Sequence, residues 1–348
     1  MICKTMPIKI SFCIPTLNRG AFIGATLESI ISQATESIEI VIVDGGSNDN
    51  TSEVVQQYEK IFPRLHYFRA GVSYAKATTV MPSGLGFDQD CNRAVELAQG
   101  EYCWLMTDDD LIMSGAIKRV LQEVDRNYAL IIANTEIRTK DLSKLIAPKR
   151  PDIMQDLVYT EEEFDQFANK LVLSHLTYVG AVIIKKSLWM SANREKYYGT
   201  GFIHVGVIFD KTIQGNILVT SNPLIVIRYG NAMWADRSGR AFQIWMFTWP
   251  RLVWSFAHIS DQAKRCIIPQ EPWRSPKYLL WQRGIGSYTS QVYRVHLSAL
   301  PATRLWKISA WLISRLPVKV LAWLLYYCGR LIRINAVALF DLKRKGQV

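Results

Sequence analysis

Short apolar segments alternate with helical patterns through the first 137 residues, and this alternation restricts the fold more than any other feature. Runs such as 38–43 (IEIVIV) are apolar throughout, as in strands that are buried on both faces. The pattern predicts an α/β fold in which helices cover a mainly parallel, Rossmann-like sheet. The expected strands are 8–15, 38–43, 65–69, 102–106 and 129–137, and the expected helices are 21–32, 51–61, 85–99 and 114–127.

Three polar clusters follow strands of this predicted sheet. PTLNR (15–19) ends the first strand, DGGSND (44–49) follows the second, and three aspartates (108–110) follow the fourth. Ligands of such sheets bind beyond the carboxyl ends of the strands, near a change in strand order. We therefore expect the three clusters to meet in one crevice.

The aspartates Asp108, Asp109 and Asp110 carry the strongest chemical signal. Adjacent carboxylates at the end of a buried strand repel one another and raise each other's pKa, and a divalent cation relieves that repulsion. Mg²⁺ or Mn²⁺ takes one or two carboxylates together with substrate phosphates. The alternative is an acidic helix N-terminus, where aspartates favour the helix dipole.

The DGGSND segment has groups that suit the binding of a nucleotide. Its glycines permit positive φ and close backbone approach, and Asp44 is placed to accept hydrogen bonds from a base or ribose. The alternative is a plain turn with Asn50 or Thr51 capping the next helix. The sequence has neither a GxxxxGK[ST] nor a GxGxxG loop, so carboxylates and a metal are expected to hold the nucleotide.

Together, ISFCIPTLNR, IEIVIVDGGSNDNT and LGFDQDCNRAVELAQGEYCWLMTDDDLI resemble the nucleotide-sugar-binding half of family 2 glycosyltransferases, over roughly residues 8–135. The resemblance implies the GT-A fold. It assigns nucleotide-sugar binding to Pro15, Thr16, Asn18, Arg19, Asp44, Ser47, Asp88, Asn92, Asp108 and Asp109. It implies a metal at the aspartates, with Asp110 the first choice and Asp108 the second, because Thr107 replaces the usual first aspartate.

A weaker resemblance, to abequosyltransferase-like enzymes that build O-antigen, covers LIVIRYGNAMW. It places Arg228, Asn231 and Trp234 on the acceptor side, and a structural strand and turn is the alternative. The usual Glu-Asp pair that supplies the base is not visible in the sequence. The candidate base is His204, since imidazole titrates near working pH, with Asp210 and Asp236 as alternatives. A satisfied core histidine is the other interpretation of His204.

The C-terminal quarter carries the chain's positive charge. Residues 264–348 hold fifteen Lys and Arg against two acids, and nine of the eleven tryptophans follow residue 230. Basic residues beside aromatics over an apolar helix face are typical of an interfacial helix, which predicts contact with an anionic membrane surface. Alternatives are a solvated basic surface and a helical hairpin packed on the catalytic domain.

The expected organisation is a catalytic domain over 1–240, with a nucleotide-sugar half (1–135) and an acceptor half (136–240), followed by a Trp-rich basic helical region over 241–348. Dispersed cysteines and the lack of a leader predict a cytoplasmic protein, peripheral on the inner face of the cell membrane.

The QxxRW motif of processive synthases is absent, which favours transfer of a single sugar. The resemblance to family 2 glycosyltransferases implies that the transfer inverts the anomeric configuration. The expected acceptor is a saccharide, polyprenyl-diphosphate-linked, in O-antigen synthesis. Alternatives are a nucleotidyltransferase acting on a sugar phosphate and a nucleic-acid-binding protein, although no nucleic-acid recognition motif is visible.

Overall fold

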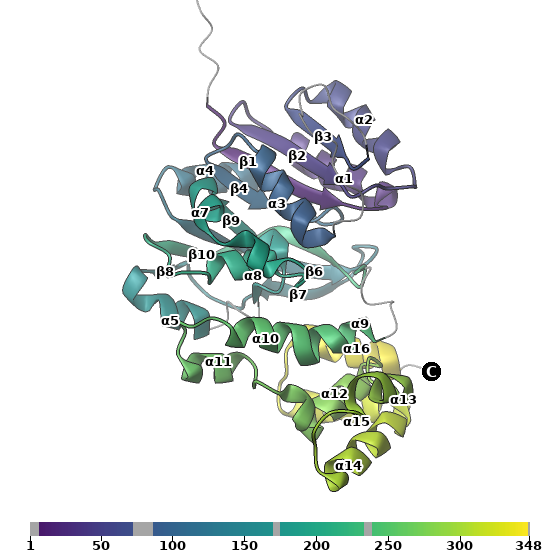
Figure 1. Ribbon diagram of the computed structural model, residues 1–348. Helices are drawn as coiled ribbons and strands as arrows, with labels where there is room; N and C mark the ends of the chain where they lie inside the picture. Colours follow the sequence, from purple (N-terminus) through teal and green to yellow (C-terminus); the bar gives the residue numbers. More distant parts are fainter. Residues whose placement is uncertain (1–6, 72–85, 170–174, 233–238, 347–348) are drawn as a thin grey trace, which may run out of the picture. The chain divides into compact units, whose positions relative to one another are not determined.

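The computed structural model describes residues 7–71, 86–169, 175–232 and 239–346 (Figure 1). The chain divides into two compact units, Met1–Tyr229 and Gly230–Val348. The first holds every strand of the sheet, and the second is helical.

The nucleotide half of the sheet is parallel, as the sequence predicts. Its strands are β1 (Ile10–Thr16), β2 (Ile38–Asp44), β3 (Leu65–Arg69) and β4 (Tyr102–Leu105), in the spatial order β3-β2-β1-β4. Strand β1 pairs in parallel with β2 on one side and β4 on the other. The chain therefore runs outward from β1 and then returns to its opposite side, which is the change in strand order where such sheets bind ligands.

The remainder of the sheet is mixed, which the sequence did not indicate. Strand β9 (Val182–Lys185) runs antiparallel to β4 and to β6 (Leu130–Thr139), and β10 (Ile217–Tyr229) runs parallel to β6. The short strands β5 (Leu111–Ile112), β7 (Leu145–Arg150) and β8 (Leu157–Tyr159) pair antiparallel at its margins. Strands of two to six residues give too little pattern to be predicted. The expected α/β class, with a mostly parallel sheet under helices, is confirmed.

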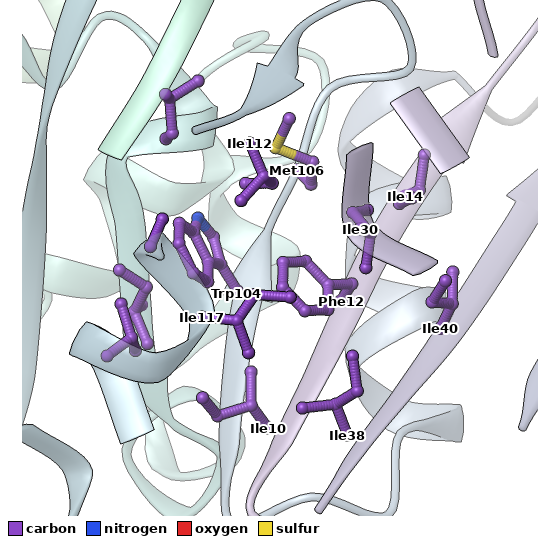
Figure 2. Close-up of a cluster of buried hydrophobic side chains, with 14 of the residues drawn as sticks. Ile10, Phe12, Ile14, Ile30, Ile38, Ile40, Trp104, Met106, Ile112 and Ile117 are labelled. Atoms are coloured by element: carbon purple, nitrogen blue, oxygen red, sulfur yellow. The ribbon is translucent and has the colours of Figure 1, made fainter. Parts of the chain in front are cut away.

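Helices pack on this sheet through apolar stripes. They are α1 (Gly20–Ile31), α2 (Thr51–Ile61), α3 (Phe87–Leu97) and α4 (Ala116–Val124). Helix α1 buries Ile23, Leu27 and Ile30, the three- and four-residue spacing of one helix face. At the centre of the core the rings of Phe12 and Trp104 stack with centroids 5.0 Å apart (Figure 2). This packing fixes the strand ends that carry the polar clusters.

Residues 136–229 form shorter helices than expected. They are η1 (Glu161–Glu163), α5 (Phe164–Phe167), η3 (Val179–Ala181), α7 (Lys186–Ser191), η4 (Arg194–Tyr197) and α8 (Ile203–Ile208). The sequence predicts one helix over 203–213, but α8 ends after six residues. The predicted helix over 161–174 begins as η1 and α5, and its end lies outside the described residues.

The second unit has its own aromatic core. Its elements are α9 (Arg240–Gln243), η5 (Ile244–Thr248), α10 (Trp249–Trp254), α11 (Asp261–Ile267), η6 (Pro272–Arg274), α12 (Pro276–Gly284), α13 (Ser290–Val292), η7 (Tyr293–Leu297), α14 (Arg304–Arg315), α15 (Val318–Leu331) and α16 (Ala336–Gly346). Phe242 stacks on Tyr288 at 5.0 Å, and Trp273 meets Trp306 edge-on at 5.3 Å. Part of the tryptophan content of this region therefore builds a core.

Phe12→Ala should lower the free energy of unfolding of the first unit by about 3–5 kcal/mol, since it removes a buried ring from the centre of the sheet. Denaturant titration followed by far-ultraviolet circular dichroism measures the change. Ile61→Ala is the control, because Ile61 is 67% exposed and its loss should cost within about 0.5 kcal/mol. Equal stability of the two variants would contradict the assigned core.

Candidate active site

The three polar clusters lie at one edge of the sheet. Thr16 at the end of β1 is in register with Asp44 at the end of β2. Arg19, just beyond β1, pairs with the aspartates beyond β4: its Nε lies 3.3 Å from Asp108 Oδ1 and its Nη2 lies 3.6 Å from Asp109 Oδ2. Pro15 is buried within β1 beside Val43. The convergence expected from strand topology is therefore present.

Asp44 organises the loop that follows β2. Its side chain is fully buried; Oδ1 accepts hydrogen bonds from the amides of Gly46 (2.9 Å) and Ser47 (2.7 Å), and Oδ2 accepts one from the Tyr67 hydroxyl. Gly46 has a φ of 104°, which a side chain would disfavour. Asp44 thus shapes the loop through contacts that hold both of its oxygens.

Asn18 and Ser47 join the loops after β1 and β2. The backbone N–H of Asn18 donates a hydrogen bond to Ser47 Oγ at 2.8 Å, and the side-chain oxygen Oδ1 of Asn18 accepts one from the backbone N–H of Asn48 at 2.8 Å. Asn18 has a φ of 54°, a left-handed conformation that asparagine tolerates better than most residues. The two loops therefore form one connected rim beside Asp108.

The aspartates after β4 are buried together. Asp108 and Asp109 are each 8% exposed and Asp110 is 3% exposed. Burial, with a smaller effect from the charge of Asp109, raises the pKa of both Asp108 and Asp110 to about 7. The guanidinium of Arg19 opposes the rise in the pKa of Asp108. Electrostatically, the site favours the arrival of a cation.

Asp110 is held by the protein itself. Its Oδ2 accepts hydrogen bonds from the hydroxyls of Thr107 (2.6 Å) and Tyr178 (2.7 Å), and its Oδ1 accepts one from the Arg228 amide (2.6 Å). Arg228 Nε also donates to the carbonyl of Asp109 at 2.9 Å. Arg228, expected on the acceptor side, therefore ties the end of β10 to the aspartate turn.

A cluster of three cations surrounds the ring of Phe22, and one of them was not predicted. The guanidinium carbons of Arg19 and Arg228 lie 5.7 and 5.3 Å from the ring centroid, and Lys140 Nζ lies 5.8 Å from it. Lys140 follows the carboxyl end of β6, which shares the edge of β4 and β10. The sequence predicts this strand over 129–137, two residues short of the end of β6, and so does not place Lys140 at a strand end.

Two polar side chains near these loops have no hydrogen-bond partner among the described residues. The buried Thr16 hydroxyl is near enough to lower the pKa of Asp108 but makes no hydrogen bond of normal geometry. Asp90, also missed, is 8% exposed, and one of its oxygens lies 2.9 Å from where a Cβ on Gly45 would sit. Burial and Asp44 raise the pKa of Asp90 to about 7. Both groups suit a polar ligand.

Asp88 and Asn92 of α3 bind protein groups in the structure. Asp88 accepts hydrogen bonds from the amides of Gly201 (2.8 Å) and Ile203 (3.1 Å), at the start of α8. Asn92 accepts one from the Trp189 indole and donates one to the Tyr198 hydroxyl, each at 2.9 Å. The two residues expected along the nucleotide therefore fix the segment 189–203.

The candidate bases occupy three different settings. His204 is 1% exposed and its Nε2 lies 2.7 Å from the Leu176 carbonyl, so the imidazole is in the interior. Asp210 accepts hydrogen bonds from the Tyr197 hydroxyl (2.7 Å) and the Asn193 amide (3.1 Å). Asp236 lies outside the described residues, as does Trp234 of the acceptor-side group. Asn231 is buried and belongs to the second unit.

The donor set at this edge fits a hard divalent cation that is shared with a substrate. Asp108 and Asp109 supply carboxylate oxygens, the ligands that Mg²⁺ and Mn²⁺ prefer, and they already face the positive charge of Arg19. Among the residues the structure describes, no three His, Cys, Asp or Glu side chains are grouped to hold a metal alone. The remaining ligands would come from substrate phosphates and water.

Comparison with known proteins agrees with this geometry. The model of a family described as glycosyl transferase family 2 matches residues 11–189, about half of the chain. The abequosyltransferase RfbV of Salmonella typhimurium is 26% identical over 288 residues, covering 76% of this chain and 81% of that protein. A Campylobacter jejuni protein named GalNAc(5)-diNAcBac-PP-undecaprenol beta-1,3-glucosyltransferase is 31% identical over 142 residues, 40% of this chain and 43% of its own length.

Solved structures share the fold. TarS of S. aureus, crystallised as residues 1–349 with UDP, aligns with a TM-score of 0.55 at 15% identity, covering 88% of this chain and 90% of that one. The mannosyltransferase PcManGT from Pyrobaculum calidifontis, in complex with GDP-Man and Mn2+, aligns with a TM-score of 0.51 at 12% identity, covering 99% and 89%. The GT-A fold implied by the sequence is confirmed.

The buried state of His204 predicts a pH dependence of stability. Burial lowers the pKa of His204 to about 4, so below its ordinary value of 6.5 the unfolded chain takes up a proton that the folded chain does not. Stability is therefore lost as the pH falls from 6.5 towards 4. Between pH 7.5 and pH 4.5, the free energy of unfolding should therefore fall by up to about 3 kcal/mol less in His204→Gln than in the wild type.

An unchanged pH dependence in His204→Gln would contradict this buried, neutral imidazole. Turnover of the same variant is the second measurement. A fall of roughly 100-fold in a folded His204→Gln variant would instead identify the imidazole as the base.

Proposed function

Because the chain belongs to glycosyl transferase family 2, we propose that this glycosyltransferase moves a single sugar from a nucleotide-sugar donor to a saccharide acceptor carried on a polyprenyl diphosphate. The observation that carries the proposal is the pairing of Asp108 and Asp109, which follow β4, with Arg19, which follows β1. These two strands are neighbours at the point where the strand order of the sheet changes. The names of two relatives supply the setting: one is an abequosyltransferase, and the other acts on a saccharide linked to undecaprenol diphosphate.

The proposed setting is O-antigen or related surface-polysaccharide synthesis at the cytoplasmic face of the cell membrane. A polyprenyl-linked acceptor is confined to a bilayer, so the enzyme must reach a membrane surface to meet it. The reaction proposed is a direct displacement that inverts the anomeric configuration, as expected for the family.

Departure of the nucleoside diphosphate is assisted by cations at the sheet edge. Arg19, Arg228 and Lys140, gathered around Phe22, offset the charge that builds on the diphosphate as the sugar leaves. A bound Mg²⁺ or Mn²⁺ would add Lewis-acid stabilisation of the same charge. The base that receives the acceptor's proton is proposed to be one of His204, Asp210 and Asp236.

We assign the metal to Asp108 and Asp109 ahead of Asp110, which changes the order expected from the sequence. The Asp110 carboxylate accepts three hydrogen bonds from Thr107, Tyr178 and Arg228, and these hold the turn in shape. Asp108 and Asp109 instead lie opposite the guanidinium of Arg19, so their carboxylates already face a positive charge. Asp110 then acts as a positioning residue for its two neighbours.

Thr16 and Asp90 are proposed to contact the nucleoside. Thr16 has a buried hydroxyl without a partner among the described residues, and Asp90 places a carboxylate against Gly45 of the adjoining loop. A carboxylate there accepts a hydrogen bond from an N–H group of a base. Asp44 accepts hydrogen bonds from the backbone N–H groups of Gly46 and Ser47 and so holds the loop after β2 in its conformation.

Asp108→Asn and Asp109→Asn should each reduce turnover of the donor by roughly 100-fold or more, because the amide keeps the shape but loses the charge that attracts the cation. Release of nucleoside diphosphate from CDP-, UDP-, GDP- and dTDP-sugars, with and without Mg²⁺ or Mn²⁺, measures the effect. Asp152→Asn, at an exposed aspartate, is the control and should behave as the wild type.

Metal-dependent turnover at the wild-type rate in an Asp108→Asn/Asp109→Asn double variant would refute the assigned site. Formation of a nucleotide sugar with release of pyrophosphate would instead identify a nucleotidyltransferase. Asp110→Asn should mainly lower the melting temperature, because an amide oxygen and NH₂ cannot accept the same three hydrogen bonds.

Lys140→Met should lower kcat with the donor by roughly 10-fold, since it removes one of the cations around the leaving diphosphate and keeps an unbranched side chain that is only one atom shorter. Lys144→Met is a matched control, because Lys144 is an exposed lysine only four residues away. Steady-state kinetics of both variants give the comparison. The role assigned to Lys140 fails if the two variants have the same kcat.

A further inference from the structure

Helices α14 and α15 pack against the rest of the second unit through one face only. Ala310 of α14 and Ala322 of α15 are buried, and the Tyr288 hydroxyl donates to the Ala310 carbonyl at 2.9 Å. Leu325 is pressed against α12, since a Cβ on Gly284 would lie 2.6 Å from its Cδ1. The core of the second unit therefore uses the inner faces of both helices.

Their outer faces are apolar and exposed. Of nineteen large hydrophobic side chains exposed in the described part of the chain, eleven fall between residues 305 and 332. They are Leu305, Ile308, Trp311, Leu312, Leu316, Val320, Trp323, Leu324, Tyr327, Leu331 and Ile332. Leu305 and Leu331 are 78% and 83% exposed. We call this set the α14–α15 face; such a concentration of exposed apolar groups marks a surface that is covered in use.

The charge around this face has one sign. Between Glu271 and Asp341 the sequence contains no acidic residue and ten Lys and Arg. In the described structure, the basic side chains of α14 and α15 form no ion pair. Two of them lie over aromatic rings instead: Arg315 is 4.2 Å from the centroid of Trp311 and Arg330 is 6.0 Å from that of Tyr326. A partner for this surface must be both apolar and anionic.

The two helices meet at a sharp bend. No single helix of the described residues is long and apolar enough to cross a membrane; α14 and α15 pass that test only as a pair, and they are bent by 97° at the short break between them. Exposed apolar groups lie on both sides of the bend, such as Leu312 before it and Val320 after it.

We propose that the α14–α15 face docks on the surface of a bilayer containing anionic lipids. Apolar side chains enter the acyl boundary, aromatic rings lie at the headgroup level, and Arg304, Arg315, Lys319 and Arg330 meet lipid phosphates. A nucleic acid satisfies the charge but leaves the apolar groups in water, so lipid is the better match. The docking deepens the proposed function, because it brings the enzyme to a lipid-linked acceptor, but its test is independent of sugar transfer.

Flotation of the full-length protein with vesicles tests the proposal. The wild type should bind vesicles of phosphatidylcholine with about one third phosphatidylglycerol, and bind pure phosphatidylcholine much less. Leu305→Ser/Leu312→Ser/Leu324→Ser should weaken the partition by roughly 10-fold or more, because each leucine contributes through the apolar area it buries. The matched control is Ile61→Ser/Met154→Ser/Val158→Ser, three exposed apolar residues outside this face, which should bind as the wild type.

A second variant separates charge from apolar contact. Arg315→Gln/Lys319→Gln/Arg330→Gln should lose most of its preference for the anionic vesicles and become less sensitive to salt. Equal binding by the leucine variant and the wild type overturns the proposal, and so does a wild type that binds neither vesicle. Retention on DNA that the leucine variant shares would identify a nucleic acid as the partner instead.

Two further measurements keep the outcomes distinct. A lower melting temperature of the leucine variant would show that the face packs inside the protein, which also overturns the proposal. Metal-dependent release of nucleoside diphosphate, assayed without membranes, should be unchanged in this variant. If vesicle binding is present while no nucleotide sugar is turned over, docking stands and the proposed activity fails.

Discussion

The repulsion among three adjacent buried aspartates is the constraint around which the first unit is arranged. The protein meets it in two ways that differ along the turn. Asp110 receives hydrogen bonds from Thr107, Tyr178 and the Arg228 amide, so its charge is stabilised by groups that stay in place. Asp108 and Asp109 instead lie opposite the charged side chain of Arg19, at 3.3 and 3.6 Å. We therefore assign Asp110 a structural role in the turn, and we propose Asp108 and Asp109 as the ligands of a cation.

Segments distant in sequence end at the edge of the sheet that carries these aspartates. The amide of Arg228, at the end of β10, reaches an aspartate 118 residues earlier. Lys140, after β6, adds a cation beside Phe22 of α1. Asp88 links α3 to the start of α8 across more than 110 residues. Residues at or just after the ends of both the first four strands and the later strands β6 and β10 therefore lie around the aspartates.

The sequence predicted the nucleotide half well, because its strands are long apolar runs and its helices have clear amphipathic spacing. The bounds of α2 and β3 were predicted correctly, and the edge carrying Thr16, Asp44 and Asp108 followed from strand topology alone. The acceptor half was harder, since β5, β7 and β8 are short and depend on pairing with β6 and β10.

Roles within the site were less predictable than its location. A motif identifies which side chains are near a ligand, but it does not say which of their oxygens the protein already uses. Asp88 and Asn92 bind the segment 189–203, and Asp110 supports its own turn, for reasons set by partners far away in the sequence. Asp90 was overlooked because a single carboxylate on a helix gives no pattern.

The aromatic core of the second unit has a practical consequence for spectroscopy. Nine of the eleven tryptophans lie in that unit, and Trp273 and Trp306 are in contact within its core. Intrinsic indole fluorescence will therefore be weighted towards the helical unit, with the buried Trp104 and Trp189 contributing the signal of the first unit. Far-ultraviolet circular dichroism reports the helices and strands of both units, so comparison of the two optical signals can resolve whether the units unfold together or in succession.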